Sequence, residues 1–243
     1  MAKKLFLVGF GPGDASSLTE KARASLAEAD LICGYTLYVD LLRPLFPEKP
    51  VTSTGMTGET ERCRFCLEEA AKGKTVALVC SGDAGVYGMA SPVFELAPLW
   101  PSVEIQVIPG VTAALSGSAL LGAPLGHDFC VISLSDRLTD WAMIEKRLRA
   151  ASMGDFAVCL YNPASRHRVD TLRRACAVLL EERSSDTVCG VTSRIGREGE
   201  SWQILTLEAL QHYPADMFTT VFIGSSKTKE IGGRMVTPRG YRT

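Results

Sequence analysis

Short apolar runs alternate with longer amphipathic stretches over the first half of the chain. The alternation predicts strands separated by helices, and the first helix opens on a capping box at Ser17–Glu20 and runs to about Ala29. Strands that alternate with helices typically form a parallel sheet with helices on both faces. The strands are expected at residues 4–8, 31–34, 50–53, 75–80 and 103–108, and two further helices at 59–72 and 91–99.

The pattern changes after the glycine-rich segment 122–126. Strands expected at 187–193 and 201–206 are joined by a short loop, which is typical of an antiparallel hairpin. We therefore expect an α/β fold of two domains, with a mostly parallel sheet in residues 1–121 and a mixed sheet in residues 122–243. The polar, basic tail from Ser225 is expected to become ordered only against a partner. The remaining strands are expected at 129–134, 155–161 and 217–223, and helices at 140–151 and 167–183.

Two glycine-bearing turns follow apolar strands in the first half of the chain. They are residues 9–14 (GFGPGD) and residues 81–88 (SGDAGVYG). In an open α/β sheet, such turns expose backbone groups to a ligand at the carboxyl ends of the strands. Two ordinary tight turns would contain the same glycines, but their occurrence together favours one ligand-binding crevice lined by both.

The two turns do not suit a phosphate. A dinucleotide fingerprint needs glycine where Asp14 stands, and Pro12 lacks the N–H that would point at a phosphate. No Lys-Ser or Lys-Thr pair follows either turn, which excludes a P-loop. Asp83 with its flanking glycines, and Tyr87 close by, suit a neutral or cationic ligand rich in hydrogen-bonding groups. S-adenosylmethionine meets these requirements, because it carries a sulfonium, an adenine and a ribose but no phosphate.

Composition narrows the classes of function. The 243 residues have a formal net charge of -1, whereas a nucleic-acid binder usually has a basic excess. No apolar run approaches the ~20 residues of a membrane helix, and Met1–Lys4 leads into a short strand without a signal-peptide core, so we expect a cytoplasmic protein. The eight cysteines, including the pair Cys63 and Cys66, are expected to pack as buried side chains rather than to bind a metal, because no histidine stands near that pair.

Short motifs distributed along the chain form a recognisable set. Those of general kind are residues 8–14, 81–88, 108–113 and 160–163, and more specific ones are residues 34–40, 126–129, 133–136, 161–166 and 196–200. With these motifs the chain resembles the tetrapyrrole methylases, S-adenosylmethionine-dependent enzymes that methylate the uroporphyrinogen-derived ring. It is most similar to the branch that methylates precorrin-3B or cobalt-precorrin-3 at C-17 in cobalamin biosynthesis. Ser81 and Ala84 replace the glycine and proline of the uroporphyrinogen methylases, which supports this later branch.

The resemblance implies where the cofactor binds. S-adenosylmethionine would lie in a cleft between the two domains and leave as S-adenosylhomocysteine. The implied contacts are Pro12, Ser81, Gly82, Asp83, Val86, Thr112 and Ala113 from the first domain, and Asn162 and Thr220 from the second. Ordinary packing would account equally well for Thr112, Ala113 and Thr220. The resemblance also implies a homodimer, while the near-neutral charge and the short apolar runs lead us to expect neither a nucleic-acid nor a membrane partner.

The chemistry implied by this branch needs neither a metal nor a covalent nucleophile. Methylation at C-17 is accompanied by contraction of the ring, which requires proton movement. His127, beside Asp128, is the predicted general acid or base, and a linker histidine bonded to the backbone is the alternative. Arg166, Arg194 and Arg197 are predicted to bind the carboxylates of the tetrapyrrole, although a solvated basic face would also explain them.

Other functions stay open at this point. Diphthamide-forming enzymes share the fold and cofactor but act on a protein, and ribosomal-RNA methylases of this fold are disfavoured by the near-neutral charge. A nucleotide-binding dehydrogenase and a non-catalytic cofactor-sensing protein are alternatives of a different class. The metal-free and the cobalt-containing substrate are not separated by the sequence.

Overall fold

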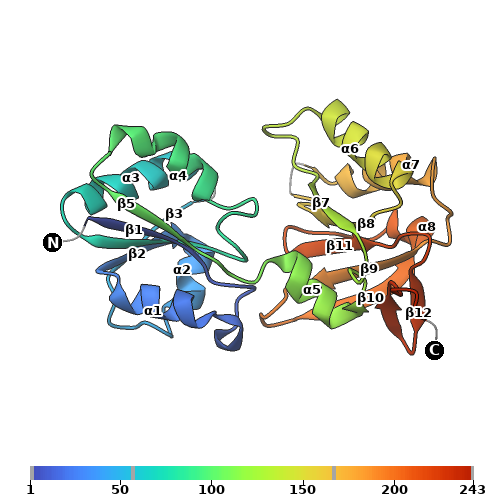
Figure 1. The fold of residues 1–243 in the computed structure, drawn as a ribbon, viewed down its shortest axis with the longest axis horizontal. Coiled ribbons are helices and arrows are strands. Elements are labelled where there is room, and N and C mark those ends of the chain that lie inside the picture. Colours follow the sequence, from blue (N-terminus) through green and yellow to red (C-terminus); the bar gives the residue numbers. More distant parts are fainter. Residues whose placement is uncertain (1–2, 56–57, 166–167, 242–243) are drawn as a thin grey trace. The chain divides into compact units, whose positions relative to one another are not determined.

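Two compact units make up the chain, Met1–Thr112 (unit 1) and Ala113–Thr243 (unit 2). The computed structural model describes residues 3–55, 58–165 and 168–241, and Figure 1 shows the elements of each unit. We expected residues 113–121 to belong to the first domain. The contacts group these residues, which form helix α5 (Ala113–Leu121), with unit 2.

Unit 1 contains a five-stranded sheet in which every strand pair is parallel. The strand order is β3-β2-β4-β1-β5, so the central strand β4 is flanked by β1 and β2. The carboxyl ends of the neighbouring strands β4, β1 and β5 therefore meet at one edge of the sheet. The bounds are Lys4–Gly9 (β1), Leu31–Tyr35 (β2), Val51–Thr54 (β3), Thr75–Cys80 (β4) and Glu104–Ile108 (β5).

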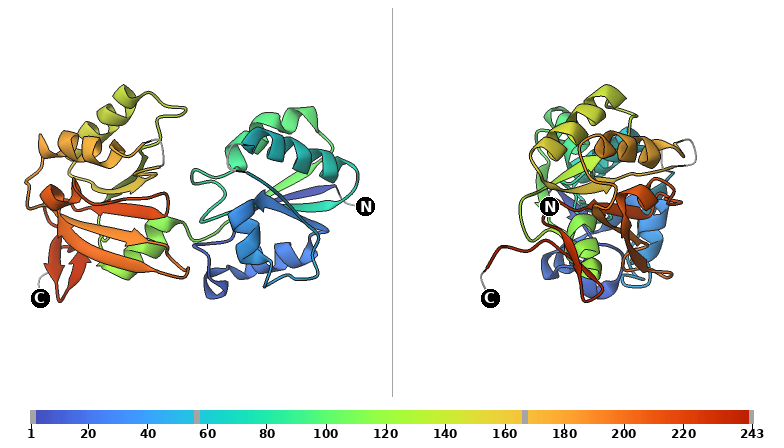
Figure 2. Two further views of the ribbon diagram at one scale, coloured as in Figure 1. Left: turned by 180° about the vertical axis from the view of Figure 1, so that it is seen from behind. Right: turned by 90° about the vertical axis from the view of Figure 1, so that its right-hand side faces the viewer.

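Helices cover both faces of this sheet, as Figures 1 and 2 show. In β1, Leu5 and Leu7 face a core shared with α3 and α4, whereas Phe6 and Val8 face a core shared with α1 and α2. This period of two follows from the pleat of a strand that is buried on both sides. The helices are Glu20–Glu28 (α1), Thr36–Leu42 (α2), Glu59–Ala71 (α3) and Ala90–Leu96 (α4), with short 3-10 turns at Ala15–Ser17 (η1) and Ala97–Leu99 (η2).

Unit 2 contains a mixed sheet with the order β10-β9-β11-β8-β7. Only β7 and β8 run parallel, and β9 and β10 form the expected antiparallel hairpin. A parallel unit 1 sheet and a mixed unit 2 sheet are thus as predicted. The bounds are Phe129–Ser133 (β7), Ala157–Tyr161 (β8), Val188–Ser193 (β9), Ser201–Thr206 (β10) and Thr219–Ile223 (β11), with helices Trp141–Met153 (α6), Thr171–Leu180 (α7) and Leu207–Leu210 (α8).

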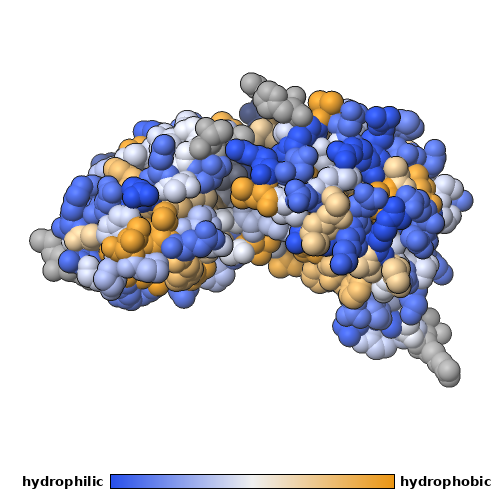
Figure 3. All heavy atoms as spheres, turned by 90° about the horizontal axis from the view of Figure 1, so that it is seen from above, coloured by the Kyte–Doolittle hydropathy of each residue, from blue (hydrophilic) through white to orange (hydrophobic). Residues whose placement is uncertain are grey.

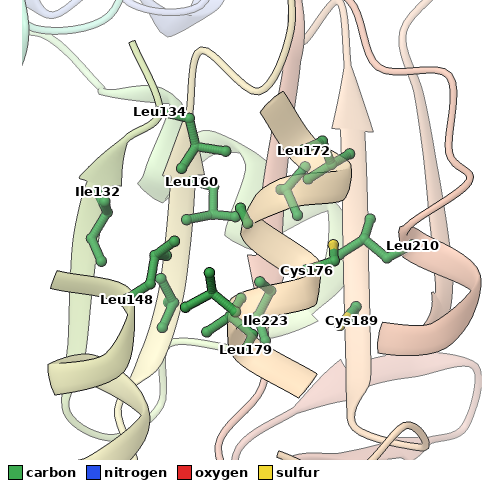
Figure 4. Close-up of a cluster of buried hydrophobic side chains, with 14 of the residues drawn as sticks. Ile132, Leu134, Leu148, Leu160, Leu172, Cys176, Leu179, Cys189, Leu210 and Ile223 are labelled. Atoms are coloured by element: carbon green, nitrogen blue, oxygen red, sulfur yellow. The ribbon is translucent and has the colours of Figure 1, made fainter. Parts of the chain in front are cut away.

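The main core of unit 2 lies between this sheet and the helices α6, α7 and α8. Figure 4 shows side chains such as Leu148, Leu160 and Leu179 converging there, together with the buried cysteines Cys176 and Cys189. Burial raises the pKa of the Cys176 thiol to about 12, which keeps it neutral as an apolar packing group. The outer surface of α6 is mostly hydrophilic, as Figure 3 shows for the helical side of unit 2.

Residues 225–241 are ordered against the chain itself, so the expectation that the tail becomes ordered only against a partner is wrong for these residues. Strands β12 (Lys229–Ile231) and β13 (Arg234–Val236) form a hairpin, and β13 pairs with β6 (Gly122–Ala123) inside the segment expected to be a linker. Met235 of β13 is fully buried in a second core of unit 2. A few apolar side chains, Ile231, Met235 and Val236, in an otherwise polar tail are too weak a pattern to predict a strand.

Helix α5 packs unusually close to the sheet of unit 2. A Cβ atom on Gly117 of α5 would lie 2.8 Å from Thr192 Oγ1 and 2.9 Å from the Phe222 ring. On β9, a Cβ atom on Gly190 would lie 2.6 Å from a methyl carbon of Leu121. Glycine at both positions lets helix and sheet approach each other without a clash.

Replacing Gly117 with alanine is therefore expected to destabilise the protein. Alanine has the higher helix propensity, but the added methyl group would overpack the buried contact with Phe222, at a cost of about 1–3 kcal/mol. Urea unfolding measures the difference, with Ser118→Ala in the same helix as the control. A more stable Gly117→Ala variant would contradict the close packing of α5.

Candidate functional site

Three loops meet at the carboxyl edge of the unit 1 sheet, after β1, β4 and β5. The backbones of the first two loops bond directly to each other: the Gly11 N–H donates to the Gly82 carbonyl over 3.0 Å, and the Gly82 N–H donates to the Gly11 carbonyl over 2.7 Å. The Phe10 N–H donates to the Cys80 carbonyl over 3.0 Å. The two glycine-bearing turns singled out from the sequence are thus hydrogen-bonded to each other.

Glycine is required where these loops touch. A Cβ atom on Gly9 would lie 2.7 Å from the Gly82 carbonyl oxygen, and one on Gly110 would lie 2.2 Å from the same oxygen. Gly11 and Gly82 also have φ angles of 79° and 70°, which disfavour other residues. The glycines at this edge therefore let three backbones pack together.

Asp83 ties two of these loops to each other. Its Oδ1 accepts a hydrogen bond from the Gly85 N–H over 2.8 Å, and its Oδ2 accepts one from the Gly110 N–H over 2.9 Å. The sequence suggested that this carboxylate or its backbone contacts the ligand. The structure gives both carboxylate oxygens a partner inside the protein, so the side chain shapes the edge from within.

Asp14 is a second carboxylate at the same edge. It accepts hydrogen bonds from the Ser17 N–H over 2.8 Å and from the Ser17 hydroxyl over 2.6 Å, and also from the Ser16 hydroxyl. Burial acts to raise the pKa of Asp14, but these hydrogen bonds lower it on balance. Asp14 is therefore ionised at neutral pH and caps η1.

The arrangement of these groups suits a cation better than an anion. The N–H groups of Gly11, Gly82, Gly85 and Gly110, which would hold a phosphate in a nucleotide-binding loop, donate to acceptors within the protein. Two carboxylates stand beside them. The predicted residues Pro12, Ser81, Val86 and Thr112 lie on these same loops, so the structure brings the predicted residues of unit 1 to one edge.

Unit 2 presents its own edge, where β7, β8 and β9 end and β10 and β11 begin. Asn162 follows β8 with a φ of 55°, and its Nδ2 donates to Ser133 Oγ over 2.9 Å. Thr220 in β11 is buried, and its carbonyl accepts from the Thr192 hydroxyl over 3.4 Å. Ala113 begins α5, whose Ala114 N–H donates to the Tyr161 hydroxyl over 2.7 Å.

Two predicted arginines lie at this edge of unit 2, on the loop after β9. The Arg194 guanidinium lies 3.7 Å from Asp216 Oδ2 and 5.0 Å from the centre of the Phe218 ring. The Arg197 guanidinium lies 5.6 Å from the same ring. Arg166, the third predicted arginine, lies outside the described residues.

Phe218 and Asp216 are residues that sequence reasoning missed. They stand before β11, and the Arg194 N–H donates to the Phe218 carbonyl over 3.2 Å. The pairing register between β9 and β11 places these loops side by side. Knowing which residues of β9 and β11 pair would have revealed Asp216 and Phe218 as neighbours of Arg194. That pairing register does not follow from the sequence pattern alone.

His127 lies at the opposite edge of the unit 2 sheet. It stands before the first residue of β7, whereas Asn162 follows the end of the parallel strand β8, so the strand length of roughly 15 Å separates them. His127 Nδ1 accepts from the Asp128 N–H over 3.0 Å, and the ring lines a cavity of about 130 Å³. Its catalytic role stays a prediction, and unit 2 does not bring it to Asn162 or Arg197. The other residues lining the cavity are Asp128, Gly154, Asp155, Ser225 and Lys227.

The part of the chain that the structure describes contains neither a candidate metal site nor a candidate membrane-spanning helix. Within residues 3–55, 58–165 and 168–241, no group of three His, Cys, Asp or Glu side chains is arranged to hold a metal ion. Cys63 and Cys66 are buried in the unit 1 core, and burial raises the pKa of Cys63 to about 12. None of the described helices has the length and apolar character needed to cross a membrane.

Comparison with known proteins identifies related sequences over the whole chain. Residues 4–211 match the family model of Tetrapyrrole (Corrin/Porphyrin) Methylases. A probable cobalt-factor III C(17)-methyltransferase of Salmonella typhimurium is 44% identical over 238 residues, which cover 98% of this chain and 99% of that protein. A precorrin-3B C(17)-methyltransferase of Sinorhizobium sp is 38% identical over 99% of this chain and 98% of its own length. This chain spans 46% of a cobalt-factor III methyltransferase of Priestia megaterium, with 44% identity.

Solved structures show the same fold. The crystal structure of the methyltransferase CobJ matches with a TM-score of 0.91 and 38% identity, covering 96% of this chain and 99% of the other. A uroporphyrin-III C-methyl transferase from Thermus thermophilus, solved in complex with S-adenyl homocysteine, matches with a TM-score of 0.70 and 23% identity, covering 91% of this chain and 97% of the other.

Removing the Asp83 carboxylate is expected to loosen the unit 1 edge. Asp83→Ala leaves the Gly85 and Gly110 N–H groups without their charged acceptor, which we expect to lower the free energy of unfolding by about 3 kcal/mol. Amide hydrogen exchange should accelerate at Gly85 and Gly110 in particular. The control is Asp40→Ala, an exposed carboxylate on α2. Unchanged exchange at both glycines would contradict the role given to Asp83.

Proposed function

The chain belongs to the family of tetrapyrrole (corrin/porphyrin) methylases, and we propose that it transfers a methyl group from S-adenosylmethionine to C-17 of precorrin-3B or its cobalt-containing counterpart in cobalamin biosynthesis. Relatives of 38–44% identity that bear C(17)-methyltransferase names extend over nearly its whole length. The family, the fold class and the methyltransferase function predicted from the sequence are confirmed. Contraction of the ring remains part of the proposal.

The chemistry of the unit 1 edge supports the choice of methyl donor. When bound, S-adenosylmethionine supplies an electrophilic methyl group on a positively charged sulfur. Asp14 and Asp83 place negative charge near such a cation, and the glycine N–H groups that would favour a phosphate are engaged. We assign the donor to the loops after β1, β4 and β5. The proposed contacts in unit 1 are Pro12, Ser81, Gly82, Asp83, Val86 and Thr112.

Methyl transfer places modest demands on the protein. It is an in-line displacement with a good leaving group, so the chain must hold the reacting atoms about 3–3.5 Å apart and exclude water. Rigid loops serve this purpose, and the paired Gly11 and Gly82 backbones and the Asp83 carboxylate make the unit 1 edge rigid. Such a rigid edge suits catalysis by positioning, for which no covalent intermediate is required.

The unit 2 edge supplies groups for an anionic substrate. Arg194 is oriented by Asp216 and by the Phe218 ring, and Arg197 lies against the same ring. A guanidinium that is already oriented loses less conformational entropy when it binds a carboxylate. We assign Arg194 and Arg197 to the carboxylates of the tetrapyrrole. Ala113, Asn162 and Thr220 are the proposed cofactor contacts from this unit, and the homodimer and the cytoplasmic location stay predictions.

Anaerobic incubation with S-adenosylmethionine and each tetrapyrrole in turn tests the function. The product is expected to gain the mass of one methyl group, and its absorption spectrum is expected to change if the ring contracts. Calorimetry should show heat with S-adenosylhomocysteine and none with NAD or ATP, because the glycine N–H groups are not available to a phosphate. Tight NAD or ATP binding without S-adenosylhomocysteine binding would overturn the proposal.

Arg197→Ala is expected to weaken binding of the tetrapyrrole and to leave the cofactor untouched. Loss of one charge-assisted contact should raise the KM for the tetrapyrrole about tenfold or more. The Kd for S-adenosylhomocysteine, from calorimetry, should stay within about twofold. Arg173→Ala, an exposed arginine on α7, is the matched control. An unchanged KM in both Arg194→Ala and Arg197→Ala would remove this assignment.

A further inference from the structure

The loop of residues 134–140 between β7 and α6, called the β7–α6 loop below, carries a fully exposed leucine. Its base is fixed, because Leu134 is fully buried and its N–H donates to the Tyr161 carbonyl over 2.8 Å. Farther along, Leu138 is 100% exposed. No backbone hydrogen bond involves residues 137–139 among the described part of the chain. The Leu138 side chain therefore has its whole apolar surface available to pack against a ligand that reaches this edge.

One charged contact ties this loop to the segment after β8. Asp136 Oδ1 lies 3.7 Å from Arg168 Nη1. Arg168 is itself anchored, since its Nε donates to Ser165 Oγ over 3.2 Å and its carbonyl accepts from the Thr171 hydroxyl over 3.2 Å. Arg168 Nη1 is buried and has no hydrogen-bond partner among the described residues. The Asp136 carboxylate is therefore a charged partner for this buried guanidinium nitrogen, and the pair links the β7–α6 loop to the segment after β8.

The loop stands at the edge of unit 2 to which the substrate was assigned. It begins directly after Ser133, whose hydroxyl accepts the Asn162 amide, and Arg194 and Arg197 follow another strand at the same edge. A tetrapyrrole combines carboxylates at its rim with a broad apolar ring face. The arginines at this edge suit the rim, and Leu138 suits the ring face.

We propose that Leu138 covers the apolar face of the tetrapyrrole, and that the Asp136–Arg168 ion pair positions the β7–α6 loop for this contact. Leu138 is then a substrate-binding residue, and Asp136 and Arg168 are positioning residues that act through it. This inference rests on the proposed function, because it takes the tetrapyrrole as the ligand of the unit 2 edge.

Leu138→Ser tests the contact without disturbing the fold, because the side chain is fully exposed. Loss of the apolar contact is expected to raise the KM for the tetrapyrrole about tenfold, with kcat and the Kd for S-adenosylhomocysteine within about twofold. Met153→Ser is the matched control, because Met153 is 81% exposed at the far end of α6. An unchanged KM in Leu138→Ser, or a changed oligomeric state without a change in KM, overturns the proposal.

A double-mutant cycle tests the positioning role of the ion pair. Asp136→Asn removes the charge with little change of size and is expected to raise the KM about threefold to tenfold in the wild-type background. In the Leu138→Ser background the same change should add less than about twofold, because the contact that it positions is already lost. Equal effects in both backgrounds would mean that Asp136 acts independently of Leu138, and would overturn this part.

The two levels of proposal fail in different ways. If the wild-type protein methylates neither tetrapyrrole, the proposed function is wrong and the loop has no such ligand. If the wild-type protein is active and Leu138→Ser has wild-type kinetics, the function stands and only the role of the β7–α6 loop is wrong.

Discussion

The contact of three backbones at Gly9, Gly82 and Gly110 is the constraint on which the unit 1 edge depends. The Gly82 carbonyl oxygen lies where a Cβ atom of either other glycine would have to be. Any side chain at these positions would force the loops after β1, β4 and β5 apart, and the hydrogen bonds from Gly110 to Asp83 and between Gly11 and Gly82 would be lost with that separation. The strand order β4-β1-β5 makes the contact possible, because it brings these three strand ends side by side.

The same constraint supports the class of ligand proposed for this edge. In many parallel α/β sheets this edge binds phosphates, because loop N–H groups point outward at a helix N-terminus. Here the N–H groups of Gly82, Gly85 and Gly110 point at acceptors within the protein, and two of those acceptor bonds end on Asp83. The topology is shared with nucleotide-binding proteins, but the direction of the hydrogen bonds favours a cation. The fold alone would not have distinguished the two.

Local patterns predicted the elements well, and contacts between distant residues escaped prediction. The alternation of short apolar runs with helical stretches was sufficient for the parallel sheet of unit 1, and Pro12 and Asp14 were sufficient to reject a phosphate. The internal partner of Asp83 was not predictable, because Gly110 lies 27 positions away in sequence. No bounds were predicted for helix α2, in which Thr36, Tyr38 and Val39 have low helix propensity and no side chain caps the start.

For the site, too, local patterns were predictive and contacts between distant residues were not. Residues on the turns themselves were placed at one edge, whereas His127 was assigned by its position near a domain junction and its neighbour Asp128. Strand register decides such questions, and it puts His127 and Asn162 at opposite ends of parallel strands. The residues of the glycine turns indicated only that the ligand is cationic or neutral. The tetrapyrrole was inferred from motifs that the chain shares with a known family, and not from a physical argument.

Backbone strain marks the same edges independently of any motif. Among the described residues, four other than glycine have a positive φ, and three of them, Tyr87, Asn162 and Arg194, stand in loops after β4, β8 and β9. Asn tolerates this region, but for Tyr87 and Arg194 it costs on the order of 1 kcal/mol or more. Glycine at these positions, or a different turn, would remove that strain. The residues other than glycine with positive φ thus lie mostly at the strand ends proposed to bind the methyl donor and the tetrapyrrole, where stored backbone strain is typical of functional sites.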